Sequence, residues 1–238
     1  MRALLLAAGL GTRLRPLTDT LPKCLMPIKG RALLGIWLER LHRSGIGPFL
    51  INTHYLSGSV ESFVETSPYR DDITLVHESE LNGTAGTLLQ NLDYFRGEDA
   101  MLIHADNYCL ADMSDFVRAH HNRPAGCVMT MMTFRTSHPE QCGIIQKDTR
   151  GVVTAFHEKI VNPPGDIANG GVYILSHELL TQLDADFRHA TDFSTQVIPR
   201  FVGRIHSYHT SEIFIDIGTP ESYAAANEER AVTPELMR

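Results

Sequence analysis

The chain reads LLLAAGLGTRLRPLTDTLPK between Leu4 and Lys23. This stretch begins with an apolar run that is typical of a buried strand. Gly9 and Gly11 then allow the backbone to turn and to approach a ligand closely, because glycine has no side chain to obstruct either. Arg13 and Lys23 follow in a segment that two prolines stiffen. The stretch therefore predicts a strand that ends in an open loop, whose amides and cations can meet a phosphate.

Two common phosphate-binding motifs do not fit this stretch. A P-loop requires G-x-x-x-x-G-K-[ST], and neither glycine is followed by Gly-Lys at that spacing. A dinucleotide-binding loop requires G-x-G-x-x-G, but Leu14 stands at the third glycine position and Pro16 follows too closely for a helix to begin cleanly. For the two glycines alone, an ordinary tight turn with solvated charges stays open as an alternative.

Composition limits the class of protein. The 238 residues fit one domain, because a single core grows to roughly 250 residues before it splits. With 43% hydrophobic and 21% charged residues, the chain has the composition of a folded globular protein. The net charge of -7 excludes binding to nucleic acid through a broad basic surface, so any bound phosphate must be neutralised locally.

Cysteine usage and hydropathy bear on the location of the protein. The four cysteines form no C-x-x-C pair and have no metal-ligand spacing, so we expect reduced thiols and a cytoplasmic protein. The first apolar run is interrupted by charged residues before it reaches the length of a signal peptide. No stretch approaches the roughly 18 apolar residues of a membrane span, so we expect no membrane contact.

Short apolar runs alternate with segments of helical periodicity. The predicted strands cover residues 2–8, 48–53, 73–77, 99–105, 126–134 and 170–175. The predicted helices cover residues 33–41, 57–64, 84–92 and 112–121, with Ser57 as the cap of the second. Uniformly apolar strands that alternate with helices predict a three-layer α/β/α sandwich with a Rossmann-like, mixed but mostly parallel sheet.

The second half of the chain has a different texture. Short strands separated by turns are predicted at residues 143–146, 151–157 and 169–175, which indicates a mixed part of the same sheet. No linker, repeat or low-complexity segment divides the chain. We therefore expect one domain over residues 1–230 and a C-terminal tail over residues 231–238.

The longer string AAGLGTRLRPLTDTLPK resembles the signature of the sugar-1-phosphate nucleotidyltransferases. These enzymes join a nucleoside triphosphate to a sugar 1-phosphate and release pyrophosphate, and the resemblance implies their GT-A-like fold. It also implies that the arginine and lysine of the signature, Arg13 and Lys23, hold the triphosphate as catalytic residues. The loop residues that it implies in nucleotide binding are Ala7, Ala8, Gly9, Gly11 and Thr12.

The chemistry of this reaction requires cations. Attack of a sugar phosphate on the α-phosphorus brings two anions together and builds charge on the leaving pyrophosphate. A guanidinium binds two phosphate oxygens at once and an ammonium acts as a point charge, so Arg13 and Lys23 complement each other. Mg²⁺ is the expected third cation and prefers oxygen ligands. The resemblance assigns it to Asp106, which follows an apolar strand, and to Asp216 in the segment IDIGTPESY.

The segment HESELNGTAGTLL resembles the base-binding loop of the family. It adds Glu78, Gly83 and Thr84 to the expected nucleotide-binding residues, although an ordinary helix start would explain Gly83 and Thr84 equally well. A carboxylate offers only acceptors, and guanine presents two adjacent donors on its Watson–Crick edge. A Glu78 carboxylate that faces the base would therefore favour GTP over a pyrimidine nucleotide.

Three later segments resemble the sugar-binding side of the family. They are CGII around residue 143, FHEK around residue 158 and NGGVY from residue 169. The glutamate is expected on sugar hydroxyls and the lysine on the phosphate of the sugar. The substrate-binding residues implied are Gly143, Glu158, Lys159, Asn169 and Gly171.

Together these features predict a nucleotidyltransferase that makes an NDP-sugar from an NTP and a sugar 1-phosphate with Mg²⁺. GTP with mannose 1-phosphate, or with a related manno- or heptose phosphate, is the specific expectation. Uridylyl or thymidylyl transfer to a hexose 1-phosphate is the first alternative, and a catalytically silent sugar-nucleotide-binding regulator is the second. We expect no left-handed β-helix of the kind that longer family members append. The sequence leaves open whether the chain forms a homo-oligomer.

Overall fold

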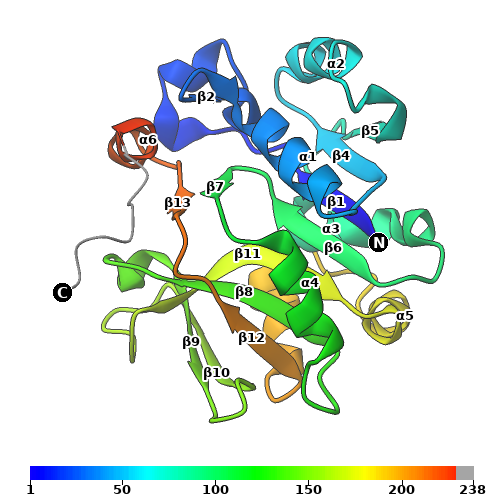
Figure 1. Ribbon diagram of the computed structural model, residues 1–238, viewed down its shortest axis with the longest axis vertical. Helices are drawn as coiled ribbons and strands as arrows, with labels where there is room; N and C mark the ends of the chain where they lie inside the picture. The colour runs from blue at the N-terminus through cyan, green and yellow to red at the C-terminus, as the bar shows by residue number, and fades with distance from the viewer. Residues whose placement is uncertain (229–238) are drawn as a thin grey trace.

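The computed structural model describes residues 1–228, and it places one large mixed sheet between two layers of helices (Figure 1). The strands are β1 (Arg2–Leu6), β2 (Pro27–Ile28), β3 (Arg31–Ala32), β4 (Phe49–Thr53), β5 (Ile73–His77), β6 (Ala100–His104), β7 (Asn107–Cys109), β8 (Met129–Arg135), β9 (Gly143–Lys147), β10 (Val153–Glu158), β11 (Ile167–Leu175), β12 (Ile205–His209) and β13 (Phe214–Asp216). The helices are α1 (Leu33–Arg43), α2 (Ser57–Glu65), α3 (Gly83–Gln90), α4 (Met113–His121), α5 (His177–Asp186) and α6 (Pro220–Glu228).

The N-terminal half of the sheet is parallel. β1 lies between β4 and β6 and runs parallel to both, and β5 continues the sheet beyond β4. Parallel neighbours need a crossover connection, which a helix supplies most easily. α1 connects β1 to β4 and α2 connects β4 to β5, so the predicted alternation of strands and helices is confirmed.

The C-terminal half of the sheet is mixed. β11 runs antiparallel to β6 and β8, and β12 runs parallel to β8. β9 pairs with both β10 and β11, so the short strands predicted in this part of the sequence are confirmed. The register of β11 on β8 shifts between Asn169 and Tyr173, where two glycines stand in the strand.

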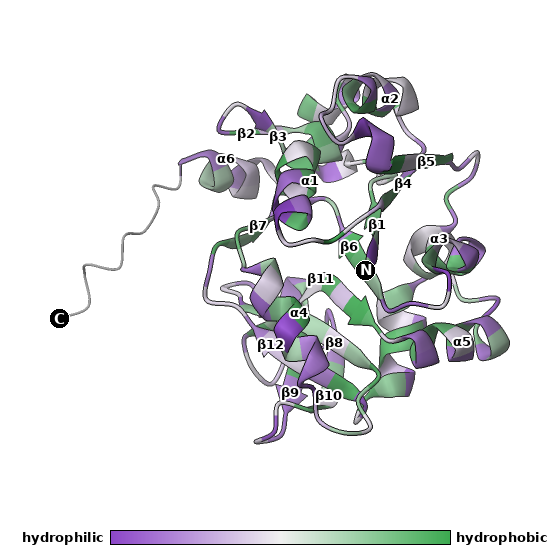
Figure 2. Ribbon diagram, turned by 45° about the vertical axis from the view of Figure 1, so that its right-hand side comes forward, coloured by the Kyte–Doolittle hydropathy of each residue, from purple (hydrophilic) through white to green (hydrophobic). Residues whose placement is uncertain are grey.

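The two faces of the sheet carry separate apolar cores, as alternate residues of β1 illustrate. Ala3 and Leu5 pack with α1, α2 and α4, whereas Leu4 packs with α3 and α5. Figure 2 shows that apolar residues follow the sheet, while the helices are polar on the side away from it. This arrangement confirms the predicted α/β sandwich, because each helix buries one stripe against the sheet.

The start of α2 differs from the prediction. Leu56, with φ 52°, is the residue that precedes the helix, and Ser57 is the first residue within it. The hydroxyl of Ser57 makes no capping hydrogen bond at this helix start. The helix therefore begins after a residue in the left-handed backbone conformation, Leu56, and not after the predicted serine cap. The predicted tail, residues 231–238, lies outside the described residues.

No helix within residues 1–228 has the length and apolar character needed to cross a lipid bilayer.

A buried polar network joins α4 to the sheet, on the face that Ala3 and Leu5 cover. His120 is fully buried, and its ring nitrogens lie 2.8 Å from the hydroxyl of Thr130 and 3.2 Å from Oδ2 of Asp99. Burial lowers the pKa of His120 below its ordinary value, although the hydrogen bond to Asp99 opposes this shift. The neutral ring is thus the form that fits the fold.

We expect His120 to make folding stability depend on pH. Because its pKa is lower in the folded chain, the unfolded chain takes up the proton first as the pH falls below about 6.5. The free energy of unfolding should therefore decrease between pH 7.5 and pH 5.5. Urea unfolding of His120→Gln should show a smaller decrease, while the exposed neighbour variant His121→Gln should keep the wild-type decrease. An unchanged pH dependence in His120→Gln would contradict the assignment.

Candidate active site

Two cavities of about 240 Å³ each lie at the carboxyl ends of the parallel strands. This is the edge at which open α/β sheets bind their ligands. The first cavity lies between the loop after β1 and helix α3. The second lies among β9, β10 and β11. His104 and Asp106 line both cavities, so the two spaces meet at the end of β6.

Most of the predicted nucleotide-binding residues line the first cavity. They are Ala7, Ala8, Gly9, Glu78, Gly83 and Thr84. Gly11 and Thr12 are not among its lining residues. Gly11 has φ 62°, and a Cβ there would lie 2.9 Å from Cγ2 of Thr18, whose hydroxyl donates a hydrogen bond to the Gly11 carbonyl. In the described structure the second glycine thus serves the packing of the loop on itself.

A buried polar cluster that the sequence analysis missed supports this cavity. Oδ1 of Asn52, at the end of β4, accepts a hydrogen bond of 2.7 Å from the amide of Ala7. The amide group of Asn52 donates to Glu78 and to the hydroxyl of Thr87. A polar residue near the end of a buried strand beside β1 is the signal that could have identified Asn52. Through the hydrogen bond to Ala7, the cluster fixes the backbone of the loop that follows β1.

The surroundings of Glu78 do not support the expected recognition of guanine by both of its oxygens. Its side chain is buried, and Oε1 already accepts hydrogen bonds from Asn52 and Thr87. Oε2 accepts from the backbone amide of Asn82. A carboxylate oxygen has two lone pairs, so Oε1 has none left for a second guanine donor. In the described structure Glu78 therefore holds the expected base-binding loop together through hydrogen bonds to Asn52, Asn82 and Thr87.

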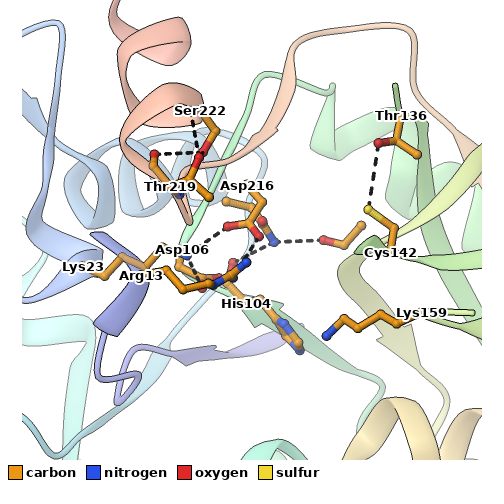
Figure 3. Close-up of polar contacts among 12 residues, drawn as sticks. Arg13, Lys23, His104, Asp106, Thr136, Cys142, Lys159, Asp216, Thr219 and Ser222 are labelled. Carbon is orange, nitrogen blue, oxygen red and sulfur yellow. Dashed lines mark hydrogen bonds and ion pairs between the residues drawn. The ribbon is translucent and has the colours of Figure 1, made fainter. Parts of the chain in front are cut away.

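The predicted cations and carboxylates meet where the two cavities join. Nζ of Lys23 donates hydrogen bonds of 2.8 Å to Oδ2 of Asp106 and 2.9 Å to Oδ1 of Asp216 (Figure 3). Asp106 follows β6, and Asp216 ends β13, whose residues pair with β7 directly after Asp106. The sheet therefore brings together three residues that are up to 193 positions apart in the sequence.

Charge stabilises this junction. Burial alone would lower the pKa of Lys23, but the charges and hydrogen bonds of Asp106 and Asp216 raise it above its ordinary value. Burial likewise opposes ionisation of Asp106, yet the neighbouring Lys23 ammonium holds the pKa of that carboxyl below its usual range. Lys23 and Asp106 are thus both charged at neutral pH, as a cation and a ligand of a phosphate site should be.

Arg13 approaches the same junction from the solvent side. Its guanidinium lies 3.8 Å from Oδ2 of Asp216, and its side chain is 64% exposed. A Cβ on Gly218 would lie 2.8 Å from Nη2 of Arg13, so this glycine leaves room for the arginine. Arg15, the second arginine of the loop, pairs instead with Asp19 on the surface.

All five predicted sugar-binding residues line the second cavity: Gly143, Glu158, Lys159, Asn169 and Gly171. Two of the glycines are required by close neighbours. A Cβ on Gly143 would lie 2.6 Å from Oε2 of Glu158, and a Cβ on Gly171, which has φ 67°, would lie 2.9 Å from the ring of His104. Asn169 stabilises the bulge in β11, because its Oδ1 accepts a hydrogen bond from the backbone amide of Gly171.

Lys159 and His104 face the space between the two cavities. The Lys159 side chain is 65% exposed, and its Nζ lies 3.4 Å from Oε1 of Glu158. Figure 3 shows this ammonium and the His104 ring directed toward the same region. Nε2 of His104 is buried and has no hydrogen-bond partner within the described part of the chain. Both side chains are therefore available to a ligand that spans the junction.

Comparison with known proteins agrees with this geometry. The family model described as nucleotidyl transferase matches residues 2–232. The chain is 27% identical over 231 residues to the putative mannose-1-phosphate guanyltransferase of Sulfolobus acidocaldarius, with 95% of this chain and 62% of that protein covered. It is 28% identical to the D-glycero-alpha-D-manno-heptose 1-phosphate guanylyltransferase of Aneurinibacillus thermoaerophilus, with 96% and 98% covered.

A solved structure shares the fold along nearly the whole chain. HddC from Yersinia pseudotuberculosis, in a crystal structure complexed with GMP-PN, is similar with a TM-score of 0.78 and 26% identity. The match covers 95% of this chain and 98% of that one. Among the mannose-1-phosphate relatives, the chain spans 62% to 66% of the length of three proteins.

The backbone of Gly83, in the expected base-binding loop, lies close to the backbone of Thr191, and a substitution tests this contact. Gly83 has φ 77°, and a Cβ there would lie 2.3 Å from the carbonyl oxygen of Thr191. Gly83→Ala should therefore lower the free energy of unfolding by about 1–3 kcal/mol in urea titrations. Gly58→Ala in α2 is the matched control, because a Cβ there meets nothing within 4 Å. Equal stability of the two variants would contradict the tight contact.

Proposed function

Because this chain belongs to the nucleotidyl transferase family, we propose that it transfers a nucleotidyl group from a nucleoside triphosphate to a sugar 1-phosphate. One observation carries the proposal: the two cavities share Asp106 and His104 and meet at the cluster of Lys23, Asp106 and Asp216. A nucleotide in the first cavity and a sugar phosphate in the second would bring their phosphates together at this cluster.

The proposed reaction is one in-line displacement. An oxygen of the sugar phosphate attacks the α-phosphorus, and the bond from that phosphorus to the bridging oxygen of the β-phosphate breaks. Pyrophosphate leaves with the electron pair of that bond, so no oxidant or further reactant is needed. The nucleophile is already an anion and requires no general base. Catalysis then depends on positioning and on cations that offset the repulsion between phosphates.

Arg13 and Lys23 are the proposed phosphate ligands. The exposed guanidinium of Arg13 can bind two oxygens of the leaving pyrophosphate, and it has freedom to follow them. Lys23 supplies a point charge at the bottom of the first cavity. On the other side, Lys159 is the proposed ligand of the sugar phosphate, while Glu158 and Gly143 face the sugar hydroxyls.

Asp106 and Asp216 fit a divalent cation. Their oxygens already converge on one cationic group, the Lys23 ammonium, at 2.8 and 2.9 Å. The described residues hold no group of three His, Cys, Asp or Glu side chains that could enclose a metal. Mg²⁺ commonly takes one or two carboxylates and completes its coordination with phosphate and water, which is what this pair allows. When bound, Mg²⁺ would neutralise charge on the triphosphate.

We propose GTP as the nucleotide, and mannose 1-phosphate or a related manno-heptose 1-phosphate as the acceptor. The names of the relatives support this choice, and so does the GMP-PN in the crystal structure of HddC. The contacts of Glu78 do not carry it, since Oε1 of that carboxylate is already saturated by protein donors. We further propose that residues 1–230 form the single catalytic domain.

Release of pyrophosphate tests the proposed function. The purified chain is incubated with Mg²⁺, with each of GTP, UTP, dTTP, ATP and CTP, and with a panel of sugar 1-phosphates. Release should be fastest with GTP and a manno-configured sugar 1-phosphate, and should require both substrates. A faster reaction with UTP or dTTP would replace the guanylyl assignment, and no release with any pair would contradict the enzyme itself.

Matched variants separate the cation site from general damage. Asp106→Asn should lower kcat/KM by at least about 100-fold, because a lost metal ligand should cost no less than a lost supporting residue. Asp71→Asn is the control, since its side chain is 90% exposed and its ion pair is with the neighbouring Arg70. Both variants should keep the wild-type melting temperature within a few degrees.

A further inference from the structure

The Lys23 ammonium occupies the point at which a metal would bind. Its side chain is only 8% exposed, and its Nζ donates to one oxygen of Asp106 and one of Asp216 (Figure 3). These are the two carboxylates that fit a divalent cation. The ammonium therefore stands where a divalent cation would take its protein ligands.

We propose that Lys23 is a built-in substitute for the metal, which blocks divalent cations from binding alone and yields the site when a triphosphate arrives. The inference rests on the proposed function for the identity of the ligand, but it concerns the order of binding, which the proposed reaction leaves open. Metal and nucleotide would then enter the site together.

Electrostatics explain why one cation must be present. Two carboxylates that converge on one point repel each other strongly if nothing positive lies between them. Lys23 removes that repulsion at distances of 2.8 and 2.9 Å. Mg²⁺ needs its oxygens at about 2.0–2.1 Å, so an ion on the same two oxygens would lie close to the ammonium, and the two positive charges would repel each other. Binding of metal alone would push Lys23 away from both carboxylates, into a cavity whose other carboxylate, Glu78, already accepts hydrogen bonds from Asn52, Thr87 and Asn82.

A triphosphate changes this balance. Lys23 lines the first cavity together with the backbone of Ala7, Ala8 and Gly9, so phosphates bound there would offer its ammonium a new anionic partner. The backbone of Lys23 is held in a short 3-10 helix (Lys23–Leu25), in which the amide of Met26 donates a hydrogen bond of 3.1 Å to the Lys23 carbonyl. Only the flexible end of the side chain has to move.

Arg13 cannot perform the same task, which makes it a useful control. Its guanidinium lies 3.8 Å from Asp216 and forms no ion pair with Asp106 within the described structure. Its removal leaves Lys23 between the two carboxylates. An Arg13 variant thus removes a positive charge near the site but keeps the blocking group, whereas a Lys23 variant removes both.

The consequence is a coupling between two ligands. A metal that must displace Lys23 binds more tightly when the triphosphate has already attracted the ammonium, and by linkage the nucleotide binds more tightly with the metal. A tenfold effect in each direction corresponds to about 1.4 kcal/mol of coupling.

Binding of Mn²⁺, followed by the electron paramagnetic resonance of the free ion, tests the proposal without any turnover. Wild type, Lys23→Gln, Lys23→Met and Arg13→Gln are titrated with Mn²⁺ in the absence of nucleotide. We expect both Lys23 variants to bind one ion at least tenfold more tightly than wild type, and Arg13→Gln to differ from wild type by less than threefold. Equal or weaker binding by both Lys23 variants would overturn the proposal.

A measurement on the wild-type chain covers the case in which the Lys23 variants do not fold, as judged by circular dichroism. A non-hydrolysable GTP analogue should raise the Mn²⁺ affinity of the protein at least tenfold above that of the analogue or the protein alone. Tight binding of Mn²⁺ by wild type alone, unchanged by the analogue, would overturn the proposal. If this coupling holds while no sugar phosphate supports pyrophosphate release, the proposed function fails and the blocking role of Lys23 stands.

Discussion

The pair of hydrogen bonds from Lys23 to Asp106 and Asp216 is the constraint on which the site depends. Each partner comes from a different part of the chain: the loop after β1, the end of β6 and the end of β13. The buried Lys23 ammonium depends on these carboxylates, because without them it would be an uncompensated charge, whereas the carboxylates themselves are 41% and 49% exposed. The interaction therefore fixes the C-terminal strand β13 against the N-terminal loop and holds the two cavities in contact.

The sheet supplies the frame for this interaction. Parallel strands β1 and β6 end at the same edge, and antiparallel β11 returns beside β6, so that its bulge at Asn169 and Gly171 faces the same space. Glycines are placed where the site is most crowded, at positions 143, 171 and 218. The side chains that they leave room for are Glu158, His104 and Arg13. The family relationship and the geometry thus point to the same junction for the proposed phosphate chemistry.

Much of this could be predicted from the sequence. Hydrophobic periodicity located the strands and helices, and motif order placed Asp106, Asp216 and Lys23 at one site. Side-chain hydrogen bonds were not predictable, since they join residues that are distant in sequence. Asn52 accepts a hydrogen bond from Ala7 across 45 positions, and Oε1 of Glu78 already accepts hydrogen bonds from Asn52 and Thr87. Motif resemblance assigns Gly11 to the nucleotide, but it does not reveal that the loop's own packing against Thr18 also requires a glycine there.

The most direct test of the central claim is a crystal structure of the chain with Mn²⁺, a non-hydrolysable GTP analogue and a sugar 1-phosphate, recorded with anomalous scattering from manganese. The account predicts a manganese peak between Asp106 and Asp216, with Nζ of Lys23 moved onto a phosphate oxygen and the sugar phosphate beside Lys159. A structure in which Lys23 still bridges the two carboxylates, with manganese and the triphosphate bound elsewhere, would contradict it.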